Sequence, residues 1–249
     1  GLGIWSILLW IILYIPISEI FLRILNYVMG KIKKPTRIPK ISYEKGIPEE
    51  LSTFIVMPTI LKSEEKIKEM FKQIEIYHLA NQDENIYFTL LGDCTTSEKE
   101  MENIDKQLIE CGKQEAENLN QKYKTKNKFN FLYRKRRWNQ GEEQYLGWER
   151  KRGLLLQFND VLLKQGQSDF IVNTLEKFEE QIKYVITLDA DTNLSLDQAQ
   201  KMIGAMSHIL NKPQIGEGRV VDGYGIMQPR VGITLEDSQK TMFTKIFAC

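Results

Sequence analysis

The sequence predicts an α/β protein in which a mixed sheet, with helices on both faces, follows a single membrane-spanning helix. Three observations indicate this fold class. Short runs rich in β-branched and aromatic residues end abruptly in polar residues, as buried strands do. Between them lie segments whose apolar residues recur at helical spacing, the alternation typical of βαβ proteins. The beginning of the chain, in contrast, is a long uncharged stretch.

The uncharged stretch runs from Gly1 to Ser18, and its apolar character continues to Met29. About 18 uncharged residues are enough for a helix that crosses a bilayer. A cleaved signal peptide is the alternative, but the stretch is too long and has neither a basic beginning nor a small-residue cleavage site. We therefore expect a transmembrane helix over residues 1–29.

A group of cations with no acid among them follows directly: Lys31, Lys33, Lys34, Arg37 and Lys40. Because cations beside a membrane helix favour the cytoplasmic side, this group places the rest of the chain there. Three prolines between residues 30 and 50 indicate a stiff basic linker. The soluble domain is expected over residues 51–249.

Expected strands and helices alternate through this domain. Strands are expected at residues 53–57, 86–91, 129–133, 184–188 and 224–231. Helices are expected after Ser63, which suits a helix cap, and at residues 97–122, 148–163, 196–210 and 235–248.

Asp189 and Asp191 follow the expected strand at residues 184–188 and are separated by one alanine. A buried parallel strand brings such residues to its carboxyl end, where open α/β sheets bind ligands. Two anions this close repel each other unless a cation compensates them, and Mg²⁺ or Mn²⁺ with a ligand phosphate suits that need. One carboxylate could hold the metal while the other meets a ligand hydroxyl or a lysine. The alternative is that both only form a turn and cap a helix.

Two further strands end in polar residues, with Thr59 after the first and Asp93 after the second. Because the carboxyl ends of parallel strands meet at one edge of a sheet, these residues and the aspartate pair are expected around one crevice. Taken alone, Asp93 would more simply be a turn-forming residue after Gly92.

Cations gather between the third and fourth expected strands. Residues 134–139 contain four of them beside a tryptophan, and residues 148–153 carry three more at the start of a helix. Cations at a helix start, next to a glycine that lets the backbone approach, suit a pyrophosphate. The candidate binding residues are therefore Arg150, Lys151, Arg152 and Gly153. The alternatives are a solvated basic loop near anionic lipid and, less favoured at a net charge of +1, a nucleic-acid site.

The other residue types that often carry chemistry give little signal. The three cysteines have no C-x-x-C spacing, which favours reduced thiols in the cytosol. His78 and His208 have no second ligand at metal spacing, so we expect them to pack or face solvent. Phosphate-binding motifs rich in glycine are absent from the sequence.

Four segments, residues 136–139, 147–153, 184–192 and 218–231, occur in an order that closely resembles the glycosyltransferase region of bacterial cyclic β-1,2-glucan synthases. The resemblance extends over nearly the whole chain. It implies a GT-A fold, which is Rossmann-like, in a processive enzyme of the bacterial inner membrane whose soluble domain lies on the cytoplasmic side. The implied partners are UDP-glucose, a growing β-1,2-glucan acceptor and membrane lipid, and the implied cofactor is Mg²⁺ or Mn²⁺.

The same resemblance implies roles for individual residues. Asp189 would contact the nucleotide, Asp191 would bind the metal, and Asp93 would face the base. Lys151 and Gly153 resemble the K-x-G that lies along the nucleotide in the wider superfamily. On the acceptor side the resemblance places Trp148, Gln228 and Arg230.

Because the donor is α-linked and the product β-linked, the resemblance also implies inversion, which needs a general base at the acceptor hydroxyl. None of the remaining acids falls where the family's base is expected, so we expect it downstream of Cys249. The chain is then the donor-binding portion of a C-terminally truncated domain, inactive alone, with further domains in the full-length protein.

Two other functions remain open from the sequence. One is a membrane-tethered module that binds a sugar nucleotide without turnover. The other is a phosphohydrolase with an aspartyl nucleophile, which is disfavoured because its D-x-D-x-[TV] signature has Asn193 at the fifth position here.

Overall fold

The computed structural model describes residues 3–33, 37–166, 168–178, 180–232, 238–242 and 244. The chain forms two compact units, Gly1–Pro39 and Lys40–Cys249. The boundaries proposed above for the linker and the domain stay predictions.

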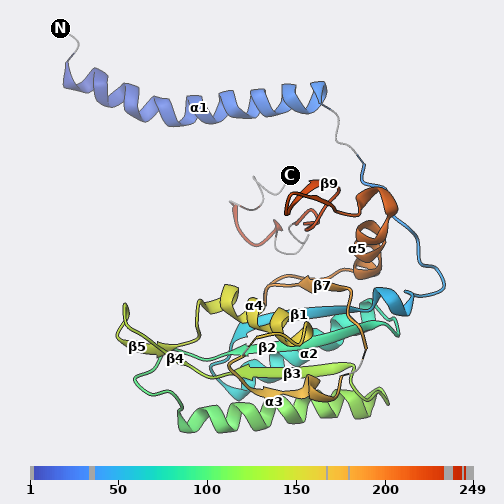
Figure 1. Cartoon of the computed structure of the whole chain (residues 1–249). Coiled ribbons are helices and arrows are strands. Elements are labelled where there is room, and N and C mark those ends of the chain that lie inside the picture. Colours follow the sequence, from blue (N-terminus) through green and yellow to red (C-terminus); the bar gives the residue numbers. More distant parts are fainter. Residues whose placement is uncertain are drawn as a thin grey trace. The chain divides into compact units, whose positions relative to one another are not determined.

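A five-stranded sheet with the strand order β6-β3-β2-β1-β7 organises the second unit (Figure 1). Its strands are β1 (Thr53–Ile60), β2 (Ile86–Asp93), β3 (Phe129–Arg134), β6 (Phe170–Asn173) and β7 (Tyr184–Thr187). The pairs β3–β2, β2–β1 and β1–β7 are parallel, whereas β6 runs antiparallel to β3. In chain order, β2 and β3 are added on one side of β1, whereas β7 is added on its other side. The strand order therefore reverses between β1 and β7.

Four helices cover the sheet: α2 (Glu64–Ala80), α3 (Asn103–Lys122), α4 (Arg150–Leu162) and α5 (Gln198–Ser207). Neighbouring residues of a strand point to opposite faces, so each face has its own apolar core. Ile55 belongs to a buried cluster that includes residues of α2, α3 and α5. Phe54 belongs to a second cluster that includes residues of α4. A mixed sheet with helices on both faces is therefore confirmed, and it is consistent with a GT-A-like fold.

Two small hairpins lie outside the main sheet, and the sequence did not predict them. They are β4 (Arg137–Asn139) with β5 (Gln144–Leu146), and β8 (Gln214–Gly216) with β9 (Arg219–Asp222). Three short 3₁₀ helices complete the unit: η1 (Glu49–Leu51), η2 (Thr174–Lys177) and η3 (Ile209–Asn211).

The strand predicted at residues 224–231 is wrong, because that segment is irregular in the structure. Its apolar residues have no sheet to join, and Ile226 is 90% exposed. Gly225 and Pro229 interrupt the segment, and proline cannot donate to a strand ladder. The helix predicted at residues 235–248 lies largely outside the described residues.

Helix α3 begins later than the predicted residue 97, and the reason is a contact with the β4–β5 hairpin. The backbone of Ser97 exchanges two hydrogen bonds with Tyr145, at 2.9 and 2.8 Å. These bonds hold Ser97 in an extended conformation, so the helix starts only after Glu102, whose backbone N–H donates to Asp105 at 2.6 Å.

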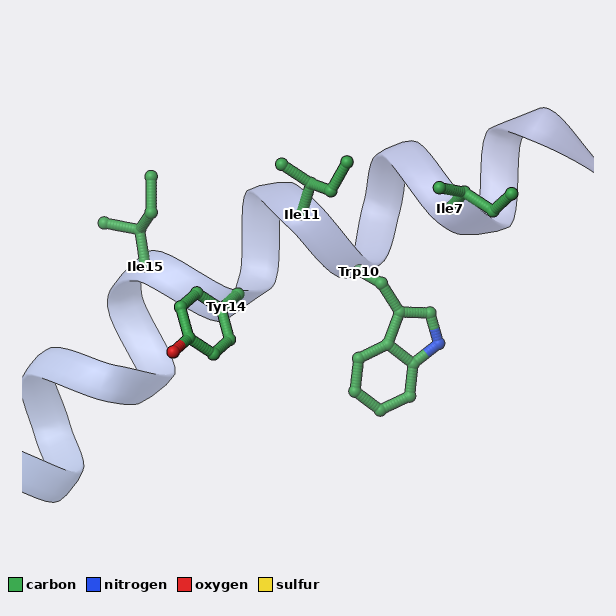
Figure 2. A pocket seen from close by; sticks show the side chains of 5 residues that line it. All are labelled: Ile7, Trp10, Ile11, Tyr14 and Ile15. Atoms are coloured by element: carbon green, nitrogen blue, oxygen red, sulfur yellow. The ribbon is translucent and has the colours of Figure 1, made fainter.

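The first unit contains α1 (Ile4–Ile32), a helix of 29 residues that includes an 18-residue window with a mean hydropathy of 2.0 and has no buried residue. By length and composition it is able to cross a membrane. Figure 2 shows the side chains of Ile7, Trp10, Ile11, Tyr14 and Ile15 projecting from this helix around a shallow hollow. Their almost entirely apolar surface suits lipid or another apolar helix, and it offers no group for sugar or phosphate recognition.

We expect the chain to stay with membranes during extraction with alkaline carbonate, because α1 exposes apolar surface along its whole length. Sedimentation of the extracted membranes measures this partition. A double variant, Ile11→Lys with Ile15→Lys, should move into the soluble fraction, since each charge at mid-helix costs about 3 kcal/mol of insertion free energy. Recovery of the unchanged chain in the soluble fraction would contradict the membrane assignment.

Candidate functional site

A hollow of about 560 Å³ lies where the strand order reverses, at the carboxyl ends of β1 and β7. This is the place at which open α/β sheets bind ligands, and the volume suits a small ligand. The residues that line it are Pro58, Thr59, Ile60, Lys62, Lys66, Asp189, Ala190 and Asp191. Thr59 and the aspartate pair are thus brought together, as predicted from the strand ends.

Strand β7 delivers the two aspartates through a short turn. Leu188 continues the pairing with β1, since its N–H donates to the carbonyl oxygen of Val56 at 3.0 Å. The chain then leaves the sheet, and the N–H of Thr192 closes back on the carbonyl oxygen of Asp189 at 3.0 Å. Both carboxylates are therefore carried on a turn that projects from the edge strand of the sheet.

Lys151 forms an ion pair with Asp189, which joins the start of α4 to the end of β7. The lysine and aspartate side chains are 46% and 61% exposed. Water screens such a pair, so its contribution to folding stability is small. The ion pair also brings together two residues predicted from the sequence to bind the nucleotide, Lys151 and Asp189. In this structure each charge compensates the other.

Asp191 lies beside this pair, exposed to solvent. In the part of the chain that the structure describes, its carboxylate has no hydrogen-bond or ion-pair partner. The described residues also contain no cluster of three or more His, Cys, Asp or Glu that could hold a metal. Mg²⁺ and Mn²⁺ do not need such a cage, because they can bind through one or two carboxylates together with water and substrate phosphates. The donor set fits a metal shared with a phosphate ligand.

Asp93 has a different environment from the one predicted. Both of its oxygens accept hydrogen bonds from Arg134, at 2.8 Å from Nε and 2.9 Å from Nη2, and its side chain is only 3% exposed. With both oxygens turned to this buried arginine, the carboxylate is occupied within the protein. Its predicted contact with a nucleotide base stays untested, and the ion pair gives it a structural role.

Arg134 also holds the turn that precedes α4. Its Nη1 donates to the carbonyl oxygen of Trp148 at 2.8 Å, and its Nη2 donates to that of Arg150 at 2.7 Å. The ion pair with Asp93 therefore fixes the backbone from which Lys151 reaches Asp189. A buried charge is stable only when its hydrogen-bonding groups are satisfied in this way.

Two glycines let this turn pack closely. A Cβ atom on Gly147 would lie 2.0 Å from Oδ1 of Asp93, and one on Gly153 would lie 2.0 Å from the carbonyl oxygen of Trp148. Between them, Glu149 and Arg150 adopt left-handed backbone angles, with φ of 47° and 50°. Non-glycine residues rarely adopt this conformation, and the surrounding contacts must hold it in place. Gly153 thus permits the turn to fold back on its helix.

A second buried ion pair, between Arg136 and Asp105, adjoins the first. Burial alone would raise the pKa of Asp105, but hydrogen bonds from Arg136, from Tyr133 and from the Glu102 N–H together hold it below its usual range. Arg136 also donates to the carbonyl oxygen of Thr95 at 2.6 Å. Arg134 and Arg136 are thus engaged in buried ion pairs with Asp93 and Asp105, and their role in the described residues is structural.

The remaining predicted residues lie at the turn and beyond. Arg150 bonds the hydroxyl of Thr96, and Arg152 pairs with Glu149 at 2.8 Å. Trp148 is 38% exposed on the same turn. Gln228 and Arg230 are exposed in the irregular segment after β9. The binding roles given to these residues stay predictions.

Sequence reasoning missed Lys62 and Lys66, which bring positive charge to the hollow. Lys62 precedes α2, and Lys66 lies in the first turn of that helix, where its Nζ pairs with Glu69 at 3.0 Å. The strand ends could have indicated these two lysines. The loop after β1 and the start of α2 must lie at the same sheet edge as Asp189. The lining of the hollow therefore contains two lysines, from the loop after β1 and the first turn of α2, and two carboxylates from the turn after β7.

The close approach at Gly147 leads to a prediction about stability. Gly147→Ala should lower the free energy of unfolding by about 1–3 kcal/mol, because the new methyl group pushes against the Asp93–Arg134 ion pair. Gly141→Ala is the matched control, since its Cβ would lie 3.4 Å from Oδ1 of Asn139, an ordinary contact. Thermal unfolding of the two variants in detergent measures the difference. Equal midpoints would show that the turn is not tightly packed.

Comparison with known proteins agrees with the resemblance seen in the motifs. No protein-family model matches the chain. The chain is 34% identical over 238 residues to the cyclic beta-(1,2)-glucan synthase NdvB of Rhizobium meliloti (strain 1021). The match covers 94% of this chain but only 8% of that synthase. The predicted resemblance is therefore confirmed, and the chain is similar to one short segment of a much larger cyclic β-(1,2)-glucan synthase.

Proposed function

We propose that this chain binds UDP-glucose together with Mg²⁺ or Mn²⁺, as the donor-binding part of a glycosyltransferase that builds β-1,2-glucan. The observation that carries the proposal is the meeting of Lys151, Asp189 and Asp191 at the strand-order reversal between β1 and β7. The similarity to a cyclic β-(1,2)-glucan synthase supports the choice of sugar and product. The choice of UDP as the nucleotide follows from what the resemblance in the motifs implies, and the phosphate and metal contacts rest on the chemistry of these side chains.

The charges around the hollow suit a sugar nucleotide. A diphosphate brings negative charge, which the lysines of this site can compensate. Lys62 and Lys66 line the hollow, and Lys151 pairs with Asp189 at its edge. Asp189 is then left to accept a hydrogen bond from a nucleotide hydroxyl. A divalent cation on Asp191 would supply the remaining positive charge to the departing diphosphate.

Transfer with inversion also needs a general base at the acceptor hydroxyl. The carboxylates of the hollow are both engaged in donor binding under this proposal, and Asp93 is buried against Arg134. Asp197, Glu217 and Asp222 are exposed outside the set of residues that line the hollow. We therefore propose that the base lies elsewhere in a longer protein, which α1 holds at the cytoplasmic face of a bacterial inner membrane.

Two substitutions should affect UDP binding in different ways. Asp191→Asn keeps the size of the side chain but removes its charge, so UDP binding should lose its dependence on Mn²⁺. Lys151→Gln should weaken binding about tenfold at every Mn²⁺ concentration, because the lysine meets the phosphates directly. Calorimetric titration of the full chain in detergent with UDP, at several Mn²⁺ concentrations, measures both effects.

Matched controls separate these effects from a general change of charge. Asp197→Asn and Lys201→Gln make the same charge changes at exposed positions that belong neither to the candidate binding residues nor to the set that lines the hollow. The first should keep the Mn²⁺ dependence, and the second should weaken binding less than Lys151→Gln. If Asp191→Asn binds UDP with the metal dependence of the unaltered chain, the assignment of Asp191 to the metal is wrong.

The chain alone should bind UDP-glucose without transferring glucose, because under this proposal both carboxylates that line the hollow are engaged in donor binding. Incubation with radiolabelled UDP-glucose, Mn²⁺ and β-1,2-glucan oligosaccharides should leave the oligosaccharides unlabelled. Calorimetry on the same preparation should show that UDP is bound. Label in the glucan would mean that one of the later acids is the base: Asp197, Glu217, Asp222, Glu236 or Asp237.

A further inference from the structure

The turn that carries the aspartates continues into a loop that lies along α2. We use the name carboxylate loop for residues 189–197, between β7 and α5. The hydroxyl of Tyr77 donates to the carbonyl oxygen of Thr192, and Nε2 of Gln73 lies 3.4 Å from Oδ1 of Asn193. Helix α2 therefore contacts this loop directly after Asp191.

The far end of the carboxylate loop is fixed by the residue that follows α2. Asn81 is fully buried, and its Nδ2 donates to the carbonyl oxygen of Ser195 at 3.2 Å. Its Oδ1 accepts the N–H of Ala199 at 2.9 Å, which satisfies a backbone donor in the first turn of α5. In addition, the N–H of Asp197 donates to the carbonyl oxygen of Ala80 at 3.0 Å. This end is therefore held by three hydrogen bonds.

The near end, next to Asp191, depends more heavily on Tyr77. Its ring is only 1% exposed and belongs to the larger apolar core, so the position of its hydroxyl is set by packing. Burial raises the pKa of Tyr77, a hydrogen bond with Gln73 opposes this rise, and the charge of Asp191 adds to it. The hydroxyl is thus close enough to the Asp191 carboxylate to be affected by its charge.

We propose that Tyr77 is a positioning residue for Asp191, which it orients through the hydrogen bond to the Thr192 carbonyl oxygen. This inference rests on the proposed function, in which Asp191 binds a divalent cation shared with the diphosphate. Asp191 has no partner of its own among the described residues, and the edge strand supports the loop on one side only. Groups that orient a metal ligand from behind contribute to metal affinity because the ligand does not have to be ordered on binding.

Tyr77→Phe tests the role, since it removes the hydroxyl and keeps the buried ring. The matched control is Tyr43→Phe, which removes a hydroxyl bonded to Ser207 at 2.8 Å from a ring that packs against the same core. With the full chain in detergent, Tyr77→Phe should weaken Mn²⁺-dependent UDP binding about tenfold. UDP binding without metal and the unfolding midpoint should match those of the control.

Two further measurements link the effect to Asp191. In the Asp191→Asn background, Tyr77→Phe should cause no further loss of UDP affinity, because two residues that act through one contact are not additive. Hydrogen exchange of the amides at residues 192–195 should be faster in Tyr77→Phe than in Tyr43→Phe.

The outcomes separate this inference from the proposed function. If the unaltered chain binds UDP with Mn²⁺ and the two tyrosine variants do so equally well, the positioning role is overturned and the proposed function stands. If the unaltered chain shows no metal-dependent UDP binding, both are overturned. A loss that persists in the Asp191→Asn background would show that Tyr77 acts on UDP by another route, and it would also overturn the positioning role.

Discussion

The buried ion pair between Asp93 and Arg134 is the constraint on which the arrangement of the candidate site depends. It joins the last residue of β2 to the last residue of β3, and the same guanidinium binds two carbonyl oxygens of the turn before α4. A charge pair this deeply buried gains little net stability, because desolvation offsets the attraction between its members. What it supplies is a single geometry, since removing either partner would leave an uncompensated charge in the core. The position of Lys151 depends on this geometry, because the lysine directly follows Arg150, whose carbonyl oxygen Arg134 binds.

The basic region therefore contains two kinds of cation with different jobs, and only the structure separates them. Arg134 and Arg136 are buried and donate hydrogen bonds to Asp93, to Asp105 and to backbone carbonyl oxygens. Lys151 is half-exposed and pairs with Asp189, in the turn after β7. Arginine suits the first task because its planar group bonds a carboxylate and a backbone at once, whereas lysine is a compact charge on a flexible stem.

Sequence patterns predicted the elements that depend on neighbouring residues. They missed the features that depend on pairing between segments far apart in the chain. Apolar runs located β1, β2, β3 and β7, and their polar ends brought Thr59, Asp189 and Asp191 to one hollow. The antiparallel β6 and the hairpins were missed because they are short and partly polar, so periodicity gave them no signal. The irregular segment at residues 224–231 reads like a strand, yet a strand forms only where a neighbour pairs with it. The partners Asp93 and Arg134 are 41 positions apart, and no sequence pattern links them.

The two halves of the candidate site are held with different rigidity. The cationic half rests on a turn locked by the Asp93–Arg134 ion pair and by glycines that allow backbone contact. The anionic half is carried on the edge strand β7, and hydrogen bonds from Tyr77 of α2 and from Asn81, directly after α2, support its loop. Without a ligand, Lys151 and Asp189 compensate each other. Under the proposed function, a diphosphate that binds Lys151 would release Asp189 to accept a hydrogen bond from a nucleotide hydroxyl. A single exchange of partners would then prepare both groups. Because the lysine side is fixed by buried charges, this exchange can be accommodated mainly by the carboxylate loop.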